Sequence, residues 1–263
     1  MRSLHPGLML CLLAAGALLA GLAAAQPRPV NVGGYPFPPF VESDPQGEWS
    51  GLTLDLLALL NRSQQDYRFI FQPTSASRRY HDFDNDRFDL MFFESPHWGW
   101  DEHAVQSLDG PTLGGEVFVA AARQGRGQAY FADRSGKRIA LYSGYHYAFA
   151  GYNADKSYLR REHNAILTFS QESSLQMVLR DRVELAVIPA AFLQRYLSEH
   201  PDYRDKLLVA AEPDQRYRYL LVKRASSEPD LAYLSDLVAR LEDTGELQKL
   251  LERHGLLASI GSQ

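Results

Sequence analysis

Segments of strand length alternate with segments of helix length along most of this chain, and that order restricts the possible folds more than any other feature. Apolar residues three and four positions apart, such as Leu52, Leu56 and Leu59, predict amphipathic helices. Short runs rich in Val, Ile, Phe and Tyr predict buried strands. This alternation is typical of α/β folds, in which crossover helices join parallel strands. Strands are expected at residues 30–32, 67–71, 88–93, 116–122, 138–142, 185–188 and 217–223, and helices at 52–62, around 175–179, at 231–241 and at 247–251.

The N-terminal segment has the pattern of an export signal. Arg2 precedes an apolar stretch from Leu8 to Leu22, which is followed by the small residues Ala23-Ala24-Ala25. A basic start, an apolar centre and small residues before the cut predict a secretory signal peptide over residues 1–25, cleaved after Ala25. The alternative is a retained membrane anchor, but a spanning helix needs about 20 apolar residues and this run is shorter. We therefore expect a protein exported to the periplasm.

Export would leave a chain without cysteine, because Cys11 is the only cysteine and lies in the predicted signal. Disulfides, thiol nucleophiles and thiolate metal ligands are then excluded, and the hydrophobic core must stabilise the fold alone. The sequence has 27 Lys and Arg against 32 Asp and Glu, a formal charge of -5, and no basic block. That balance argues against a nucleic-acid partner.

Several short stretches occur in the order and at the spacing found in one family of exported proteins. Examples are Phe37-Pro38-Pro39-Phe40 and the segment that opens the first helix at Gly51. Together the stretches cover nearly all of the chain that would remain after export. The chain thereby resembles the bacterial periplasmic solute-binding proteins of the amino-acid-binding family, which have the type II two-lobed fold. The matching stretches are 37–40, 51–56, 86–91, 136–144, 182–187 and 241–247.

The resemblance implies an architecture of two α/β lobes, each a mostly parallel sheet flanked by helices. Lobe 1 would comprise residues 26–115 plus 218–263, and lobe 2 would comprise residues 116–217. The chain is expected to cross between the lobes near residues 115–118 and 216–219. A small-molecule ligand would bind in the cleft between the lobes, which would close on it about a hinge.

Three polar anchors that this family uses to hold an amino acid are replaced in this chain. The resemblance implies an Arg for the ligand carboxylate shortly after the third strand, but residues 94–103 contain no Arg or Lys and Asp101 stands close to that position. Pro189 stands in place of the lobe-2 Asp, and Gly34 in place of an acidic residue of the first loop. An anion in place of a guanidinium would repel a ligand carboxylate. We therefore expect a ligand other than a standard α-amino acid.

Aromatic and acidic side chains remain at the predicted cleft. Aromatic faces beside a carboxylate suit a cation or a flat ring, through cation–π attraction and stacking. We also expect Gly144 to open a helix whose free N–H groups could bind an anionic oxygen. The predicted ligand-binding residues are Tyr35, Phe37, Glu94, Trp98, Trp100, Tyr145 and His146.

Purely structural roles are the alternatives for several of these residues. Trp98 and Trp100 could pack beneath the hinge without touching a ligand. Glu94 could be solvated, or it could pair with Arg78 or Arg79.

Two histidines near the predicted cleft raise the question of a metal. His97 and His103, together with Glu94 and Asp101, are a candidate cluster. Their spacing in a loop is not typical of a strong zinc site, and no thiolate would be available. We expect solvated histidines, no bound metal and no cofactor.

The resemblance implies a monomeric, non-enzymatic protein that captures a small solute for the membrane permease of an ABC importer or for a sensor receptor. One alternative is a ligand-free regulatory domain that docks on a membrane sensor. Another is a periplasmic enzyme, such as a dehydratase or hydrolase, on the same scaffold. The sequence has no nucleophile elbow, zincin His pair or phosphate loop. Glu94 with His97 or His146 could nevertheless perform acid–base chemistry.

Overall fold

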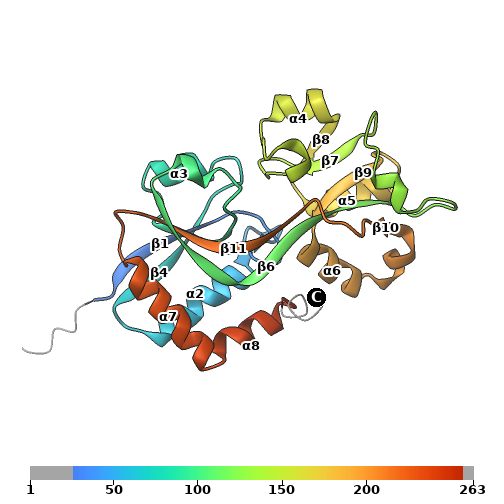
Figure 1. Cartoon of the computed structure of the whole chain (residues 1–263). Coiled ribbons are helices and arrows are strands. Elements are labelled where there is room, and N and C mark those ends of the chain that lie inside the picture. The colour runs from blue at the N-terminus through green and yellow to red at the C-terminus, as the bar shows by residue number, and fades with distance from the viewer. Residues whose placement is uncertain (1–25, 257–263) are drawn as a thin grey trace, which may run out of the picture.

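The computed structural model describes residues 26–256, which form two halves joined by two long strands (Figure 1). The first half contains β1 (Arg28–Gly34), α2 (Leu52–Ser63), β4 (Tyr67–Pro73), α3 (Arg79–Asp84), β5 (Leu90–Glu94), α7 (Leu231–Asp243) and α8 (Glu246–Arg253). The second half contains β7 (Ile139–Tyr142), α4 (Lys156–His163), β8 (Ala165–Thr168), α5 (Gln171–Leu179), β9 (Leu185–Pro189), α6 (Ala190–Glu199) and β10 (Leu207–Val209). The joining strands are β6 (Val105–Ala121) and β11 (Gln215–Arg224).

A nine-stranded sheet runs through both halves in the order β4-β1-β5-β11-β6-β9-β7-β8, with β10 added to β6. In the first half β1 lies parallel to β4 and β5, and in the second half β7 lies parallel to β8 and β9. The joining strands are antiparallel to each other and to their neighbours β5 and β9. The predicted α/β fold with two lobes, each built on parallel strands, is confirmed.

Helix α2 illustrates how the sequence pattern fixes the first half. Its apolar residues repeat at helical spacing, so they form one face, and that face packs against β4. Burial of each leucine side chain stabilises the fold by roughly 1.5–3 kcal/mol. Asp55 lies in the first turn, where the helix dipole favours a negative charge, and its carboxylate lies 2.9 Å from Nε2 of His254 at the end of α8. The buried residues of α2 are Leu52, Thr53, Leu56, Leu57, Leu59 and Leu60.

Strand β6 changes its pairing partner at Glu116. Glu116 of β6 pairs with Gln215 of β11 and also with Pro189 of β9. The pairing therefore passes from the first half to the second within the crossover region that the sequence predicts. The lobe boundaries, 26–115 plus 218–263 and 116–217, stay a prediction, because strand pairing does not divide the chain at a residue.

The expected strands and helices are all present, although β6 begins at Val105 rather than at residue 116. Several elements are not predicted by the sequence pattern: α3, α4, α6, β8, β10, and a short hairpin of β2 (Glu42–Ser43) and β3 (Trp49–Ser50). Helix α4 shows the reason: only Leu159 is buried along it, so it carries no apolar periodicity.

The expectation that Gly144 opens a helix is wrong. Gly144 has a φ of 90°, and a short 3-10 turn, η3 (Ala148–Ala150), follows it instead. A Cβ at Gly144 would lie 2.7 Å from the backbone nitrogen of Ser77 in the first half. Glycine is required here because the two halves approach each other closely and the backbone is left-handed.

The predicted signal peptide, residues 1–25, lies outside the described residues. Within residues 26–256, none of the helices combines the length and the apolar character needed to span a bilayer.

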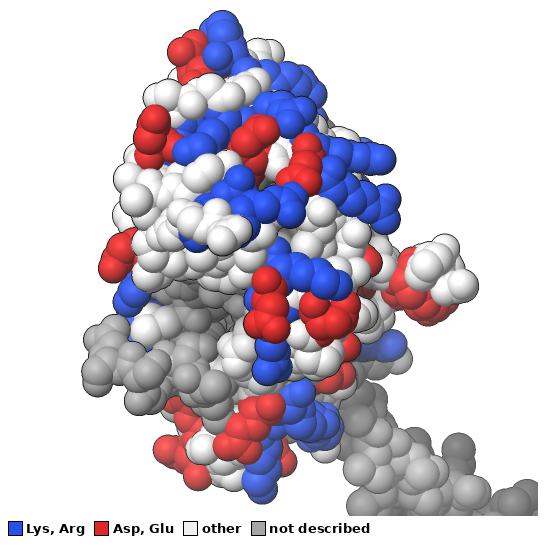
Figure 2. All heavy atoms as spheres, turned by 90° about the vertical axis from the view of Figure 1, so that its right-hand side faces the viewer, with Lys and Arg blue, Asp and Glu red and all other residues white. Residues whose placement is uncertain are grey.

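The outer face of the second half carries both signs of charge. Figure 2 shows Lys and Arg side chains interspersed with Asp and Glu across this face. Arg138 lies 2.8 Å from Glu184, and Arg123 pairs with Asp181. Exposed pairs of this kind contribute about 0–1 kcal/mol each, so the fold depends little on them.

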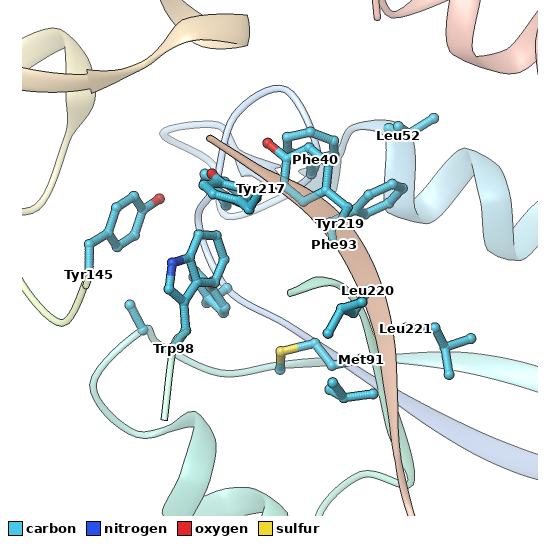
Figure 3. Packing of buried hydrophobic residues seen from close by; sticks show 14 of the residues in the cluster. Phe40, Leu52, Met91, Phe93, Trp98, Tyr145, Tyr217, Tyr219, Leu220 and Leu221 are labelled. Atoms are coloured by element: carbon cyan, nitrogen blue, oxygen red, sulfur yellow. The ribbon is translucent and has the colours of Figure 1, made fainter. Parts of the chain in front are cut away.

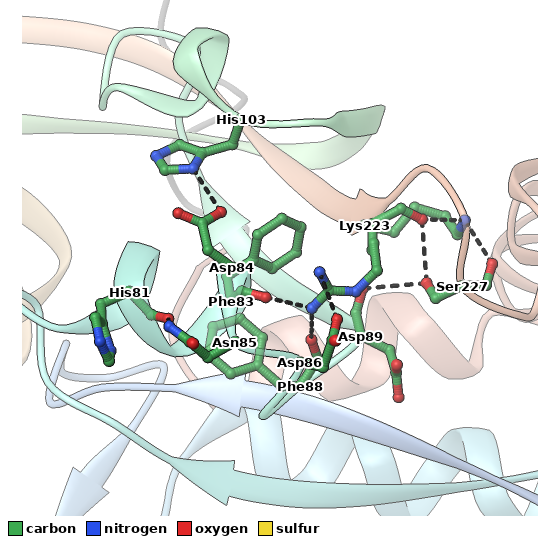
Figure 4. A network of polar contacts seen from close by, with 11 residues as sticks. His81, Phe83, Asp84, Asn85, Asp86, Phe88, Asp89, His103, Lys223 and Ser227 are labelled. Carbon is green, nitrogen blue, oxygen red and sulfur yellow. Dashed lines mark hydrogen bonds and ion pairs between the residues drawn. The ribbon is translucent and has the colours of Figure 1, made fainter.

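A polar network fixes the loop between α3 and β5 against the end of β11 (Figure 4). Arg224 donates hydrogen bonds to the backbone oxygens of Phe83 and Phe88, the second at 2.9 Å, and lies 2.9 Å from the Asp86 carboxylate. The neighbouring Lys223 donates to the backbone oxygen of Ser227 at 2.8 Å. Both cations thereby satisfy backbone acceptors near the end of the strand.

We expect Arg224→Met to lower the free energy of unfolding by about 1–3 kcal/mol, because it leaves those backbone oxygens without a charged donor. Urea unfolding followed by circular dichroism measures the loss. Arg216→Met, at an exposed position on the same strand, is the control and should change stability by less than about 0.5 kcal/mol. Equal losses in the two variants would contradict the role of the network.

Candidate functional site

The loop after β1 buries its aromatic side chains where the two halves meet. Its prolines prevent a helix, and the turn is closed by the backbone nitrogen of Phe37, which donates to the oxygen of Val41 at 2.9 Å. Tyr35 and Phe37 are only 5% and 3% exposed, and their ring centroids lie 6.1 Å apart. The sequence predicts a loop that displays aromatic rings, and these rings form one wall of the candidate site.

Trp98, in the loop after β5, adds a second aromatic surface from the first half. Its ring contacts Phe37 edge-on at 5.7 Å and Tyr217 of β11 at 4.9 Å. Figure 3 shows the indole nitrogen on the side of the ring that faces Tyr145. Trp98 therefore lies at the junction between the first half, a joining strand and the second half.

Tyr145 brings the second half into contact with these rings. It follows β7, and its ring meets Tyr35 at 6.1 Å and Phe37 at 5.5 Å, both edge-on. Its hydroxyl donates to the backbone oxygen of Pro36 at 2.9 Å. The two halves are thus in direct contact through aromatic side chains, in a closed arrangement.

A buried ion pair lies beside the aromatic contacts. Arg79 of α3 and Glu94 at the end of β5 are each 1% exposed, and Nε of Arg79 lies 3.4 Å from a carboxylate oxygen of Glu94. The same oxygen accepts a hydrogen bond from the Trp100 indole at 2.7 Å. Of the two arginines proposed as partners of Glu94, the structure brings Arg79 to it and leaves Arg78 exposed beside Asp82.

The Arg79 guanidinium also reaches the second half. It lies 5.0 Å from the centre of the Tyr35 ring and 4.3 Å from that of Tyr80. Across the junction it donates to the backbone oxygen of Gly144 at 3.2 Å and lies 3.3 Å from Nδ1 of His146. The combination of aromatic faces and a carboxylate, which was expected to suit a cationic or flat-ring ligand, thus surrounds a cation of the chain itself.

The charges at this site are set by burial and by the ion pair. Burial raises the pKa of Glu94, and the Arg79 guanidinium and the Trp100 N–H oppose that shift. We take the Glu94 carboxylate as ionised at neutral pH, because a guanidinium stays protonated in proteins and this carboxylate is its anionic partner. Burial, and then the charge of Arg79, lower the pKa of His146 to about 3, so its ring is neutral.

A second buried acid lies where β6 changes partners. Glu116 is 1% exposed and accepts a hydrogen bond from the Tyr217 hydroxyl at 2.8 Å. Burial raises the pKa of Glu116 to about 8, so this carboxyl group is mostly protonated at neutral pH. Gln215, beside it in the sheet, donates to the backbone oxygen of His146 at 2.7 Å.

Several buried polar atoms near the junction have no hydrogen-bond partner among the described residues. Such atoms are costly to bury alone, by about 1–3 kcal/mol each, so they can bind a small polar molecule or water when the halves separate and close. They come from both halves and from the joining strands. They are Nε of Arg79, which has only its ion-pair contact with Glu94, Nε1 of Trp98, Oε2 of Glu116, Oγ of Ser143, both side-chain amide atoms of Gln171 and Oε1 of Gln215.

The structure brings most of the predicted site residues together. Tyr35, Phe37, Trp98 and Tyr145 meet at the junction, and His146 lies beside Arg79. Trp100 lies behind them in the first half, where its ring packs on Tyr80 and Phe83. Their roles as ligand contacts stay a prediction.

Glu116 and Tyr217 were missed from the sequence as site residues, and Arg79 was considered only as one of two possible partners of Glu94. Arg79 lies in a short polar helix, and nothing in its local sequence distinguishes it from Arg78. An acid at the start of the apolar run 117–121 was a usable signal for Glu116, because charges are rarely buried without a partner.

The histidines of the candidate metal cluster have other neighbours. His97 stacks on Tyr152 with ring centroids 4.9 Å apart, and Nδ1 of His103 lies 2.9 Å from Asp84 (Figure 4). Over residues 26–256, His, Cys, Asp and Glu side chains do not gather in groups of three or more that could hold a metal ion.

Comparison with solved structures identifies the fold. A histidine kinase sensor domain with similarity to periplasmic binding proteins superposes with a TM-score of 0.69 at 20% identity, covering 88% of this chain and 97% of that one. The substrate-binding protein of an ABC uptake transporter from Streptococcus pneumoniae, with bound histidine, gives 0.66 at 16% identity, covering 86% and 91%. The chain has the two-lobed fold of periplasmic binding proteins. At such identities these likenesses establish the fold and not the ligand.

Another solved structure with this fold is connected with an enzyme. The ancestral amino-acid-binding protein AncCDT-1, a precursor of cyclohexadienyl dehydratase, gives a TM-score of 0.62 at 14% identity, covering 86% of this chain and 94% of that one. No family model matches the sequence, and no curated protein matches it. The fold alone therefore does not distinguish a binding protein from an enzyme, and the residues of the site must be considered.

The buried acid predicts an unusual dependence of stability on pH. The folded-state pKa of Glu116, about 8, lies above the value of about 4.3 expected when unfolded. Between these values the folded protein holds a proton that the unfolded chain has lost, so the free energy of unfolding falls as pH rises, by up to ~1.4 kcal/mol per pH unit. The lowered pKa of His146 acts in the opposite direction below about pH 6.5. Between pH 6.5 and 8 the contribution of His146 fades, and the difference in slope between wild type and a Glu116 variant measures the contribution of Glu116.

We expect Glu116→Gln to flatten the fall in stability between pH 6.5 and 8. Urea unfolding at several pH values measures the slope. Glu212→Gln, at an exposed position nearby, is the control and should keep the wild-type slope. A wild-type slope in Glu116→Gln would show that another group causes the dependence.

Proposed function

We propose that this protein is a periplasmic solute-binding protein, which captures a small solute between its two halves and presents it to a membrane partner. The observation that carries the proposal is the junction itself. Aromatic rings of both halves meet there, among buried polar atoms that have no protein partner. A hinged pair of lobes with such a junction suits capture by closure. The partner would be the permease of an ABC importer or a sensor receptor.

The proposed solute is not a standard α-amino acid. The segment that follows β5 contains no Arg or Lys, and Pro189 ends β9 where the resemblance implies an Asp. Arg79 is the guanidinium nearest the junction, and Glu94 and the backbone oxygens of Ala76 and Gly144 already engage it. A ligand carboxylate would have to displace these contacts to gain a charged partner.

A ligand-free regulatory domain is the second candidate. It is favoured by the direct contact of the halves and by the internal cation, since both let the molecule close by itself. An enzyme is less well supported, because Glu94, the acid closest to the junction, is held in an ion pair and His146 is neutral with a low pKa.

Thermal-shift screening separates the candidates. A solute held only by the folded state raises the unfolding temperature in a concentration-dependent way, through a stabilisation of RT ln(1 + [L]/Kd). The panel contains amines, aromatic compounds, sugars, carboxylates and amino acids. Stabilisation by one class without turnover supports solute binding. Turnover would indicate an enzyme, and silence across the panel would indicate the regulatory domain.

Capture by closure also requires that the halves open, and one ion pair holds them from outside the junction. Glu42 of β2 and Arg195 of α6 lie on opposite halves, and their two contacts measure 2.5 and 2.6 Å. Both side chains are about 30% exposed, so the pair is only partly screened by solvent.

We expect Glu42→Gln to raise the open population of the solute-free protein by roughly two- to tenfold, because a bidentate pair of this kind contributes about 0.5–1.5 kcal/mol. Small-angle scattering, or distance measurement between labels on the two halves, detects the change. Glu199→Gln is the matched control, since Glu199 lies 3.8 Å from the same arginine but on its own helix. An unchanged distance distribution in Glu42→Gln would contradict a latch at this position.

A further inference from the structure

We infer that the solute captured at this junction is an uncharged molecule with a flat ring, and that Arg79 is the residue that sets this preference. The inference rests on the proposed function and names its class of solute. Two independent features support it: the cancellation of charge at the junction, and the character of the side chains that face each other there.

The charges of Arg79 and Glu94 at the junction already neutralise each other. Arg79 and Glu94 are both 1% exposed, and their closest atoms lie 3.4 Å apart, so neither is free for a charged solute. His146, on the opposite half, lies 3.3 Å from the guanidinium and is neutral. A cationic solute beside Tyr35 would meet the charge of Arg79, and an anionic one would meet Glu94. Either would lose its hydration without gaining an unpaired counter-charge.

The surfaces that remain suit a ring with polar atoms on its edge. Tyr35 and Phe37 approach from one half and Tyr145 from the other, and their rings meet edge-on, so a solute that enters when the halves open would lie between aromatic side chains of both halves. The unpartnered N–H of Trp98 can donate to an oxygen of the solute, and the side-chain oxygen of Gln215, beside the Glu116 carboxyl group, can accept from an N–H. Trp98 is 4% exposed and Gln215 5% exposed, so these groups would bind in a largely dry site. A neutral amide, or a ring nitrogen with an adjacent N–H, offers both partners.

Three probes of nearly the same shape test the charge preference directly. Benzamide, benzamidinium and benzoate share one ring and a planar three-atom substituent, and they differ in charge. Isothermal titration calorimetry at pH 7, up to 10 mM probe, gives their dissociation constants. We expect benzamide to bind at least tenfold more tightly than either ion.

The other possible results contradict either this inference alone or the proposed function as well. Tighter binding of benzamidinium or benzoate overturns the inference and leaves the protein a solute-binding protein. Silence toward all three probes, with a response to another class in the wider thermal-shift panel, also overturns the inference alone. Silence toward the probes and the whole panel overturns the proposed function as well.

Variants of the ion pair test whether Arg79 sets the preference. Arg79→Met keeps most of the side-chain volume and removes the cation, so Glu94 should then favour benzamidinium over benzamide by at least tenfold relative to wild type. The double variant Arg79→Met with Glu94→Gln removes both charges, and benzamide should again bind best. If Arg79→Met alone fails to fold, the double variant still provides the test, because it buries no unpaired charge.

Arg78→Met is the matched control. Arg78 is adjacent in sequence, but its side chain is 66% exposed and pairs with Asp82 away from the junction. It should retain the wild-type order of the three probes. If the double variant binds an ion best, or if Arg78→Met changes the order as much as Arg79→Met does, the assignment to Arg79 is wrong.

Discussion

The buried ion pair of Arg79 and Glu94 is the interaction on which the arrangement of the site depends. Two charges removed from water are tolerated only when each satisfies the other and further hydrogen bonds complete the pair. Trp100 and the backbone oxygens of Ala76 and Gly144 supply those bonds. Because one of these oxygens belongs to the second half, the ion pair does more than stabilise the first half. It gives the closed arrangement a polar contact that exists without any solute.

The joining strands connect the two halves that this contact holds together. Within residues 26–256 the chain passes between the halves only in β6 and β11, and the partner change at Glu116 lies between the parallel strands of the two halves. A rotation about this region would separate Tyr145 from Tyr35 and Arg79 from Gly144 while leaving each three-stranded core intact. A mostly protonated acid at the same place makes the joining region sensitive to alkaline pH, where a buried charge would appear.

The fold and the site carry different information about function. Solved structures with this fold include a protein with bound histidine and a sensor domain, so the scaffold allows transport and sensing alike. At the junction of this chain, aromatic rings surround an arginine that is paired within the chain itself. Under the proposed function, the solute would be selected by shape, stacking and neutral hydrogen bonds. Such selection excludes ions through the cost of dehydration rather than through repulsion alone.

The sequence by itself determined the α/β class, the order of the main elements and the aromatic character of the junction, because apolar periodicity and proline placement are local properties. It also singled out Tyr35, Phe37 and Trp98, whose rings the structure brings together where the halves meet, while their role as ligand contacts stays a prediction. Only the tertiary structure decided that Arg79 rather than Arg78 reaches Glu94, and that Gly144 forms a close turn instead of a helix start. Those outcomes depend on contacts between residues far apart in the chain, whose distances no local pattern encodes.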